Sequence, residues 1–359
     1  MSFEITNELL ANITSYIEAS NDKPIIALFE EMHYADVAEI LDELSFDDVI
    51  YIIKLIDSEK TSAVLMELDE DIREKILQKL SAKEIAEEVE ELDSDDAADI
   101  IGELSQERQE AVLSKIEDEE HVKEIEELLA YDEDSAGGLM AKELVKVNEN
   151  WTVLKCVREM RTQAEEVTRV HSIYVVDDND KLKGRLSLKD LLITSTKTAI
   201  SEVYIPKVDF VNVHDNLDEV SNKMRKYDLE AIPVIDNNGV LLGRITIDDI
   251  VDVIKEGADK DYQLAAGLTQ DVEADDSILQ LTKARLPWLF LGLLGGVGAF
   301  LIMVMFENTF DENAVLFFFT PLIAAMAGNV GVQSSAIIVQ GLANDDVKGS
   351  INSRLVKEM

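Results

Sequence analysis

The feature that most constrains this chain lies near its carboxyl end, where residues 286–306 form a run of 21 residues without a charged side chain. About 20 apolar residues in a helix, each rising about 1.5 Å, cross a hydrocarbon core about 30 Å thick. A second uncharged run covers residues 313–344 and includes several amides and hydroxyls. We therefore expect two membrane spans, at about 286–306 and 314–342.

The charges beside these runs predict an orientation. Basic residues flank the two runs on their outer sides, and the loop between them contains only acidic charges; the basic residues are Lys283, Arg285, Lys348, Arg354 and Lys357, and the acidic ones are Glu307, Asp311 and Glu312. The positive-inside rule places both outer flanks in the cytosol. Residues 1–30 contain no basic start followed by an apolar stretch, so no signal peptide is expected. The pattern predicts a multi-pass protein of the inner or plasma membrane with a cytosolic N-terminal region.

The acidic charge is concentrated before the spans. The chain has 74 acidic and 33 basic side chains, and residues 1–134 alone hold 41 acidic and 10 basic ones, a net charge of −31. Nucleic acid is excluded as a partner, because its phosphates need Lys and Arg for neutralisation. Metal cations suit such a surface, since carboxylate oxygens bind them, although acidic charge can also serve solubility alone. The single cysteine, Cys156, excludes an internal disulfide and fits a reducing compartment.

Residues 1–134 show the pattern of short amphipathic helices. Residues 38–45 (AEILDELS) return sixty positions later as 98–105 (ADIIGELS), with apolar side chains at steps of three and four. Ser45, Ser81, Asp93 and Ser105 are suited to cap helix N-termini. The pattern predicts an all-α helical-repeat domain over 1–134.

Residues 135–257 contain two matching units spaced by 59 positions. Residues 173–177 (IYVVD) and 184–192 (GRLSLKDLL) correspond to 232–236 (IPVID) and 243–250 (GRITIDDI). Each unit reads as strand, turn, strand and helix. Over residues 139–256 the pair resembles a tandem CBS domain, an α/β regulatory module. The resemblance implies possible nucleotide binding, with ATP as a candidate ligand, by Ser187 with Asp190 and by Thr246 with Asp249. Helix capping is the alternative that the pattern itself favours, because S/T-x-x-D is a capping pattern.

The order of parts along the chain resembles the MgtE family of magnesium transporters. Residues 131–140 (YDEDSAGGLM) resemble the segment that joins the helical and CBS domains in that family, and the Gly pair within them indicates a backbone shape that other residues avoid. Residues 285–288 (RLPW) and 328–335 (GNVGVQSS) match the family's membrane region. The resemblance implies a homodimer in membrane lipid that transports Mg²⁺ and senses cytosolic Mg²⁺ between its helical and CBS domains.

The resemblance also implies a set of metal-binding carboxylates, which are Asp95, Asp99, Asp218, Asp228, Asp249, Asp252 and Asp261. Spacings of four and of three residues place Asp95 with Asp99, and Asp249 with Asp252, on shared helix faces. Two such faces repel each other unless divalent cations lie between them. Asn216, Gly257 and Lys260 replace expected acidic residues, which weakens the sensor site near the connecting helix.

The second span contains the predicted pore-lining residues, Asn329, Gln333, Ser334 and Ser335. Polar side chains at this depth must face protein or water, so hydrogen bonding between helices is the alternative. Gln340 stands where the family often has Arg. The resemblance implies five membrane helices per subunit. Because two spans precede residue 359, we expect this chain by itself not to form a conducting pore.

These expectations define a multi-domain chain. Its parts are an acidic helical domain (1–134), a tandem CBS pair (135–257, with units at about 139–198 and 199–257), a connecting helix (258–284) and a partial transmembrane domain (285–359). The predicted function is Mg²⁺ transport gated by the cytosolic domains. The alternatives are a CBS-regulated transporter of another divalent cation and a membrane-anchored nucleotide sensor. No catalytic motif is found, so an enzyme is not expected.

Overall fold

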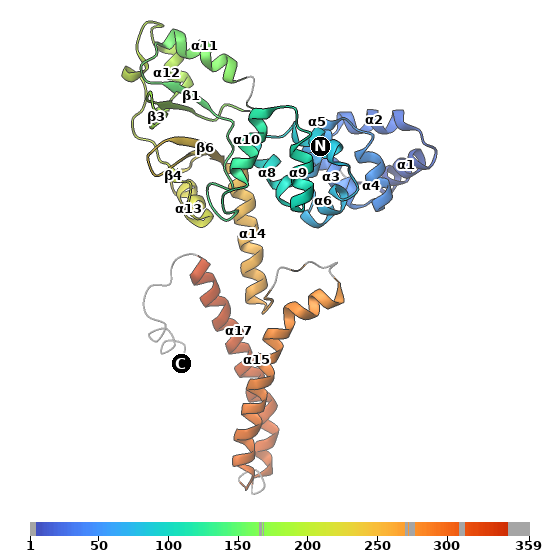
Figure 1. Ribbon diagram of the computed structural model, residues 1–359. Coiled ribbons are helices and arrows are strands. Elements are labelled where there is room, and N and C mark those ends of the chain that lie inside the picture. Colours follow the sequence, from blue (N-terminus) through green and yellow to red (C-terminus); the bar gives the residue numbers. More distant parts are fainter. Residues whose placement is uncertain are drawn as a thin grey trace. The chain divides into compact units, whose positions relative to one another are not determined.

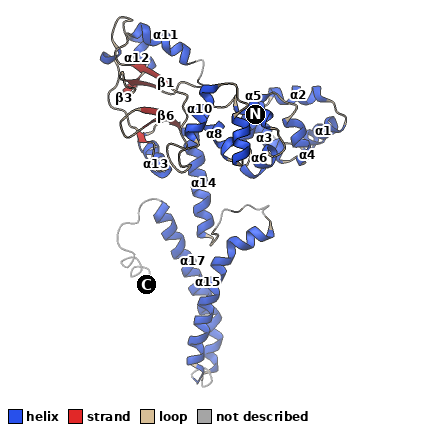
Figure 2. Ribbon diagram, in the orientation of Figure 1, coloured by secondary structure: helices blue, strands red, loops and turns tan. Residues whose placement is uncertain are grey.

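The computed structural model (Figure 1) describes residues 5–343 except 165, 166, 168, 270, 271, 273–276 and 309–312. The chain divides into two compact units, residues 1–250 and 251–359. Among the described residues, strands occur only between Val145 and Thr246, and helices make up most of the rest (Figure 2). The predicted fold class is confirmed: a helical domain, an α/β CBS pair and long apolar helices.

The N-terminal domain is an array of short helices. They are α1 (Asn7–Glu18), α2 (Asp22–Glu31), α3 (Tyr34–Asp42), α4 (Phe46–Ile53), α5 (Ser58–Glu67), α6 (Glu70–Leu77), α7 (Ala82–Val89), α8 (Ser94–Gly102), α9 (Gln106–Leu113) and α10 (Glu119–Leu128). α3 packs on α5, α5 on α7, and α7 on α9, so each turn of the array buries apolar side chains against the next. This stacking is expected for a helical repeat.

The N-caps of these helices recur every twelve residues. The cap positions from α3 to α9 are His33, Ser45, Asp57, Asp69, Ser81, Asp93 and Ser105. Ser45 accepts a hydrogen bond from its own helix, and Ser81 forms a full capping box with Glu84. Asp93 and Ser105 occupy cap positions without a side-chain capping bond.

The CBS pair contains two three-stranded sheets of the same topology. The first consists of β1 (Val145–Asn148), β2 (Ile173–Val176) and β3 (Leu182–Leu186), and the second of β4 (Val211–Asn212), β5 (Ala231–Ile235) and β6 (Leu241–Thr246). In each sheet the first two strands are parallel and the last two antiparallel. The register shifts between Val175 and Val176 in one unit and between Val234 and Ile235 in the other, 59 residues apart.

Helices flank the sheets of both CBS units. They are α11 (Val153–Gln163), α12 (Leu188–Ile193), the 3-10 turn η1 (Ile200–Glu202) and α13 (Leu217–Tyr227). The turns of the two units meet, since Leu182 N–H donates to Gly239 O (2.9 Å) and Leu241 N–H donates to Asp180 O (3.0 Å).

The junction segment, residues 134–141, joins the helical domain to the second CBS unit. Ala136 N–H donates to Asp215 O (2.8 Å) and Gly137 N–H to Val213 O (2.9 Å). The reason expected for the Gly pair was wrong, because neither glycine has a positive φ. A Cβ on Gly137 would instead lie 2.6 Å from the Val213 side chain, and one on Gly138 would lie 2.6 Å from Asp132 O. The glycines therefore allow close packing, and one hydrophobic cluster runs from the helical domain through Ala136 and Met140 into the second CBS unit.

The second compact unit of the chain, residues 251–359, is helical over most of its described residues. α14 (Ile247–Ala265) begins in the second CBS unit and passes residue 257 without a break, and α15 (Ile278–Met305) contains Pro287. After the 3-10 helix η2 (Ala314–Phe319), α17 covers Thr320–Ala343. The connecting helix predicted over 258–284 falls partly outside the described residues.

Two helices match the requirements of a membrane span. α15 and residues Thr320–Ile338 of α17 are long and apolar enough to cross a bilayer, judged by length and composition. Their large apolar side chains are exposed in the structure, among them Trp288, Phe290 and Ile323. The charges used for the orientation at Asp311, Glu312, Lys348, Arg354 and Lys357 lie outside the described residues.

Candidate metal centre between the helical and CBS domains

The first turn of α8 carries a dense group of carboxylates. The helix begins after Asp93, and its first residues are Ser94, Asp95 and Asp96. Acidic side chains are favourable at a helix N-terminus, where the unpaired N–H groups concentrate positive charge. Asp99 follows one turn after Asp95, so the predicted pair lies on one side of the helix.

The structure brings this helix face to Asp249 of α14. Burial raises the pKa of Asp95 well above its ordinary value, and the negative charges of Asp96 and Asp249 add to the shift. The pKa of Asp96 is raised to about 7 by burial and then by the charges of Asp249 and Asp99. Three predicted residues, Asp95, Asp99 and Asp249, therefore share one electrostatic environment.

Asp99 occupies the more open part of this group. Its side chain remains exposed, yet the surrounding protein desolvates the carboxyl and raises its pKa to about 7. The charge of Arg73 opposes this shift, and the charges of Glu103, Glu133 and Asp249 add to it. Arg73 itself forms an ion pair with Glu103, which leaves much of its charge already compensated.

Asp249 is held in place by the end of β6. Its Oδ2 accepts hydrogen bonds from Thr246 N–H (3.0 Å) and from Thr246 Oγ1 (2.7 Å). These bonds lower the pKa of Asp249, but burial, the largest influence, leaves it raised. The capping interpretation of Thr246 and Asp249 thus describes the contacts observed in the second CBS unit.

Three further carboxylates, those of Asp93, Asp96 and Glu143, belong to the group and were not predicted as ligands. Potential ligand atoms of Asp93, Asp95 and Glu143 all lie within 4.8 Å of one another. Glu143 comes from the chain just before β1, and it accepts hydrogen bonds from Ser94 N–H (3.0 Å) and Ser94 Oγ (2.9 Å). No sequence pattern links Glu143 to this group, since it lies 48 residues after Asp95 and belongs to no shared helix face or repeat. Asp96, in contrast, could have been included as the direct neighbour of Asp95.

One cation reaches this group from the CBS side. The buried guanidinium of Arg244 lies 3.6 Å from an Asp93 carboxylate oxygen and donates to Arg169 O at 3.1 Å. The single positive charge of this guanidinium cannot balance the negative charge of the ionised carboxylates, which belong to Asp93, Asp95, Asp96, Asp249 and Glu143. Oxygen ligands in this number and with this charge suit a hard divalent cation.

Of the remaining predicted metal ligands, two lie apart from this group and two belong to the second compact unit, residues 251–359. Asp218 is in the first turn of α13, and Asp228 ends that helix with a left-handed φ of 51°. Both are exposed. Asp252 is an exposed residue of α14, and Asp261 lies farther along the same helix. Their role as ligands stays a prediction.

The first CBS unit differs from the second at the predicted nucleotide residues. Ser187 stands at the N-cap of α12 but makes no capping bond with its side chain. Ser187 and Asp190 line a cavity of about 440 Å³, together with Arg185, Lys189 and His171 among others. Thr246 and Asp249 do not line this cavity and bond to each other instead.

The predicted pore-lining residues all lie on α17. Asn329 and Gln333 are exposed, and Ser334 and Ser335 are half-buried. Asn329 and Gln333 are four residues apart, so they share one side of the helix. Whether this side lines an ion path stays a prediction.

Comparison with known proteins gives the family context. The model of the MgtE intracellular N domain matches residues 32–134, and the CBS domain model matches residues 136–195 and 200–256. The magnesium transporters MgtE of Thermus thermophilus and Enterococcus faecalis are each 36% identical, over 60% and 64% of this chain. These matches cover 49% and 50% of the two relatives, so the chain spans about half of their length.

Solved structures agree with these matches. The cytosolic domain of the Mg²⁺ channel MgtE in complex with ATP is 32% identical with a TM-score of 0.64, and covers 68% of this chain and 99% of its own. The soluble part of a magnesium transporter is 28% identical with a TM-score of 0.62, and covers 70% of this chain and 98% of its own. With its helical domain, CBS pair and junction in the same order, the chain belongs to the MgtE family.

Proposed function

We propose that this chain carries the Mg²⁺-sensing cytosolic domains and the first membrane helices of a magnesium transporter of the inner membrane. The observation that carries the proposal is the meeting of Asp95, Asp96 and Asp99 with Asp249, where the pKa of Asp96 and of Asp99 is raised to about 7. Cytosolic pH lies near these pKa values, so the carboxyls are only partly ionised, and each charge that forms repels the others. Mg²⁺ bound between them removes this repulsion and favours the arrangement in which the two domains meet.

The relatives named above are magnesium transporters, and on that basis we extend the proposal to the rest of the chain. In the proposed protein, Asp218, Asp228, Asp252 and Asp261 add ligands around the second CBS unit and α14. Asn329, Gln333, Ser334 and Ser335 of α17 contact hydrated Mg²⁺ in the membrane. The active form is a multi-pass homodimer in lipid that moves an ion without catalysing a reaction. The domain limits 1–134, 135–257, 258–284 and 285–359 belong to this proposal.

Limited proteolysis of the full chain in detergent micelles tests the sensor. We expect Mg²⁺ in the millimolar range to protect the region around the junction segment from cleavage. The variants Asp95→Asn and Asp249→Asn lose this protection because the ion loses charged ligands. Sodium chloride at the same ionic strength gives the baseline, so that screening is separated from binding.

Asp47→Asn is a matched control. Asp47 stands two residues after the cap of α4, as Asp95 does after the cap of α8, and its side chain is exposed away from the junction. It keeps full Mg²⁺ protection if the proposal is right. Equal loss in Asp47→Asn, or no protection in the unmodified chain, rules out a Mg²⁺ sensor at the junction.

A second function, nucleotide binding by the first CBS unit, is favoured by the open cavity at Ser187. Arg185 and Lys189 offer positive charge for phosphates, and the Ser187 hydroxyl is not used for capping. We expect calorimetry with ATP or AMP on the full chain to show binding that Ser187→Ala weakens about tenfold, the effect of one hydrogen bond to a charged group. Thr246→Ala serves as the control, because its hydroxyl is bonded to Asp249. No binding, or equal loss in both variants, excludes a nucleotide site at Ser187.

A further inference from the structure

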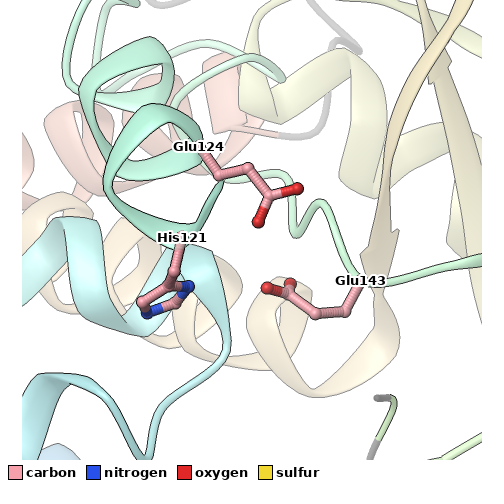
Figure 3. A group of neighbouring side chains, drawn as sticks. All are labelled: His121, Glu124 and Glu143. Atoms are coloured by element: carbon pink, nitrogen blue, oxygen red, sulfur yellow. The ribbon is translucent and has the colours of Figure 1, made fainter. Parts of the chain in front are cut away.

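A second group of possible metal ligands lies on the other side of Glu143. His121 and Glu124 are three residues apart on α10 and point from the same side of the helix toward Glu143 (Figure 3). Ligand atoms of the three side chains lie within 4.8 Å of one another. All three are half-buried, so protein already surrounds them on several sides.

The hydrogen bond of His121 determines which ring nitrogen is available. Nε2 lies 3.3 Å from Val89 O, and because a carbonyl oxygen only accepts, Nε2 is the protonated nitrogen. The neutral ring then has an unprotonated Nδ1 with a free lone pair. Figure 3 shows one ring nitrogen facing the two carboxylates and the other pointing away from them. A histidine whose second nitrogen donates to a backbone carbonyl is the usual arrangement around bound zinc.

Glu143 is oriented in the same way by its neighbours. The two bonds from Ser94 hold its carboxylate at the N-terminus of α8. The nearby cation Lys142 forms an ion pair with Glu127 at 2.7 Å. The carboxyls of Glu124 and Glu143 are turned toward each other (Figure 3). Burial raises the pKa of Glu124 to about 7, and the negative charges of Glu143 and Glu120 add to this shift.

There is room and access for an ion at this position. His121, Glu124 and Glu143 line a cavity of about 770 Å³ whose other walls include Glu90, Asp93, Glu117 and Glu120. The acidic walls attract cations, and the open side admits water as a further ligand. The imidazole makes this group different from the all-carboxylate set around Asp95.

We propose that His121, Glu124 and Glu143 bind a divalent transition-metal ion, with Zn²⁺ as the preferred ion. Zinc takes His and Glu ligands at about 2.0–2.2 Å, so tetrahedral ligand atoms stand roughly 3.4 Å apart. Because the ligand atoms lie within 4.8 Å of one another, adjustments of at most about 1.4 Å bring them to that geometry. Mg²⁺ prefers six oxygens and gives up water reluctantly, so an imidazole nitrogen selects against it.

The bound ion would join two domains. His121 and Glu124 belong to the helical domain, whereas Glu143 lies within the first CBS match. Zinc there would hold α10 against the chain that enters β1. This site shares Glu143 with the acidic group around Asp95, whereas His121 and Glu124 belong to the zinc site alone. Variants of His121 and Glu124 therefore test zinc binding separately from the proposed Mg²⁺ sensor.

Calorimetric titration of the full, tag-free chain in detergent with Zn²⁺, in a millimolar excess of Mg²⁺, tests this site. We expect one high-affinity zinc per chain. His121→Gln and Glu124→Gln each weaken binding by at least about tenfold, since even outer-shell changes at zinc sites cost 10- to 100-fold. Substitution by Co²⁺ gives visible absorption bands that His121→Gln removes.

The controls separate the site from general effects. His214→Gln alters an exposed histidine outside the cavity and leaves zinc binding unchanged. Thermal unfolding without metal checks that each variant folds, and Glu124→Gln is expected to fold at least as stably as the unmodified chain, because it removes a carboxyl that is costly to ionise. Zinc affinity that is unchanged in His121→Gln, or that Mg²⁺ abolishes at comparable concentrations, overturns the proposal whatever the Mg²⁺ proteolysis shows.

Discussion

Asp96 and Asp99 lie where ionisation costs free energy. Both have a pKa of about 7 in the folded protein, against 3.8 for an ordinary aspartate. Between pH 3.8 and about pH 7 the native state binds more protons than the unfolded state. The free energy of unfolding therefore falls as the pH rises through this range. A bound divalent cation reverses this cost, because it supplies the positive charge that the proton supplied at lower pH.

Asp96→Asn removes one of these carboxyls and keeps the shape of the side chain. Without divalent cations, we expect the variant to be more stable than the unmodified chain at about pH 8, by about 1–3 kcal/mol. The difference shrinks toward about pH 5, where native Asp96 is protonated and neutral. Urea unfolding at both pH values measures it.

Saturating Mg²⁺ should narrow the difference at the higher pH. Asp47→Asn, which changes the same charge on an exposed helix start, should show little difference at either pH. A variant no more stable than the unmodified chain at the higher pH would contradict a repulsive carboxylate group.

The helices of the N-terminal domain reflect a twelve-residue unit of sequence. One cap residue, about eight to ten helical residues and a short turn fill each unit. Because the N-caps recur at a fixed spacing, each helix begins at the same position of the twelve-residue unit. Alternate helices of the array then stack on each other. The first turn of α8, which holds Asp95, is thus one instance of a position that occurs in every helix of the repeat.

Two serines at equivalent cap positions differ in their bonds and allow a matched comparison. Ser81 and Glu84 form a capping box at α7, whereas Ser105 makes no side-chain bond at α9. We expect Ser81→Ala to lower the free energy of unfolding by about 1 kcal/mol. Ser105→Ala should change it by much less. Equal losses in urea unfolding would mean that the capping box contributes little to the array.

At the scale of the whole molecule, regular patterns in the sequence predicted the fold well. The 59-residue repeat gives two sheets with the same register shift, and the recurring caps give the helical array. The meeting of Asp95 and Asp99 with Asp249 was implied by the family resemblance, and the structure places these residues in one electrostatic environment.

Other parts of the site depend on how the domains pack, which no local pattern records. Glu143 has no periodic partner and reaches both acidic groups only because the junction segment pairs with the second CBS unit. Ser187 and Thr246 occupy matching positions in the repeat, yet Ser187 lines a cavity and the Thr246 hydroxyl donates to Asp249. This difference arises from tertiary contacts. The sequence repeat alone therefore predicts the same role for Ser187 and Thr246, whereas their surroundings in the structure differ.

Glu143 has one more consequence, since it belongs to both possible ligand groups, one with Asp93 and Asp95 and one with His121 and Glu124. Two ions that draw on one carboxylate are thermodynamically linked. The factor by which zinc alters the affinity for magnesium must equal the factor by which magnesium alters the affinity for zinc. The response of the chain to either metal would then depend on the level of the other, through one carboxylate that lies where the helical domain meets the first CBS match.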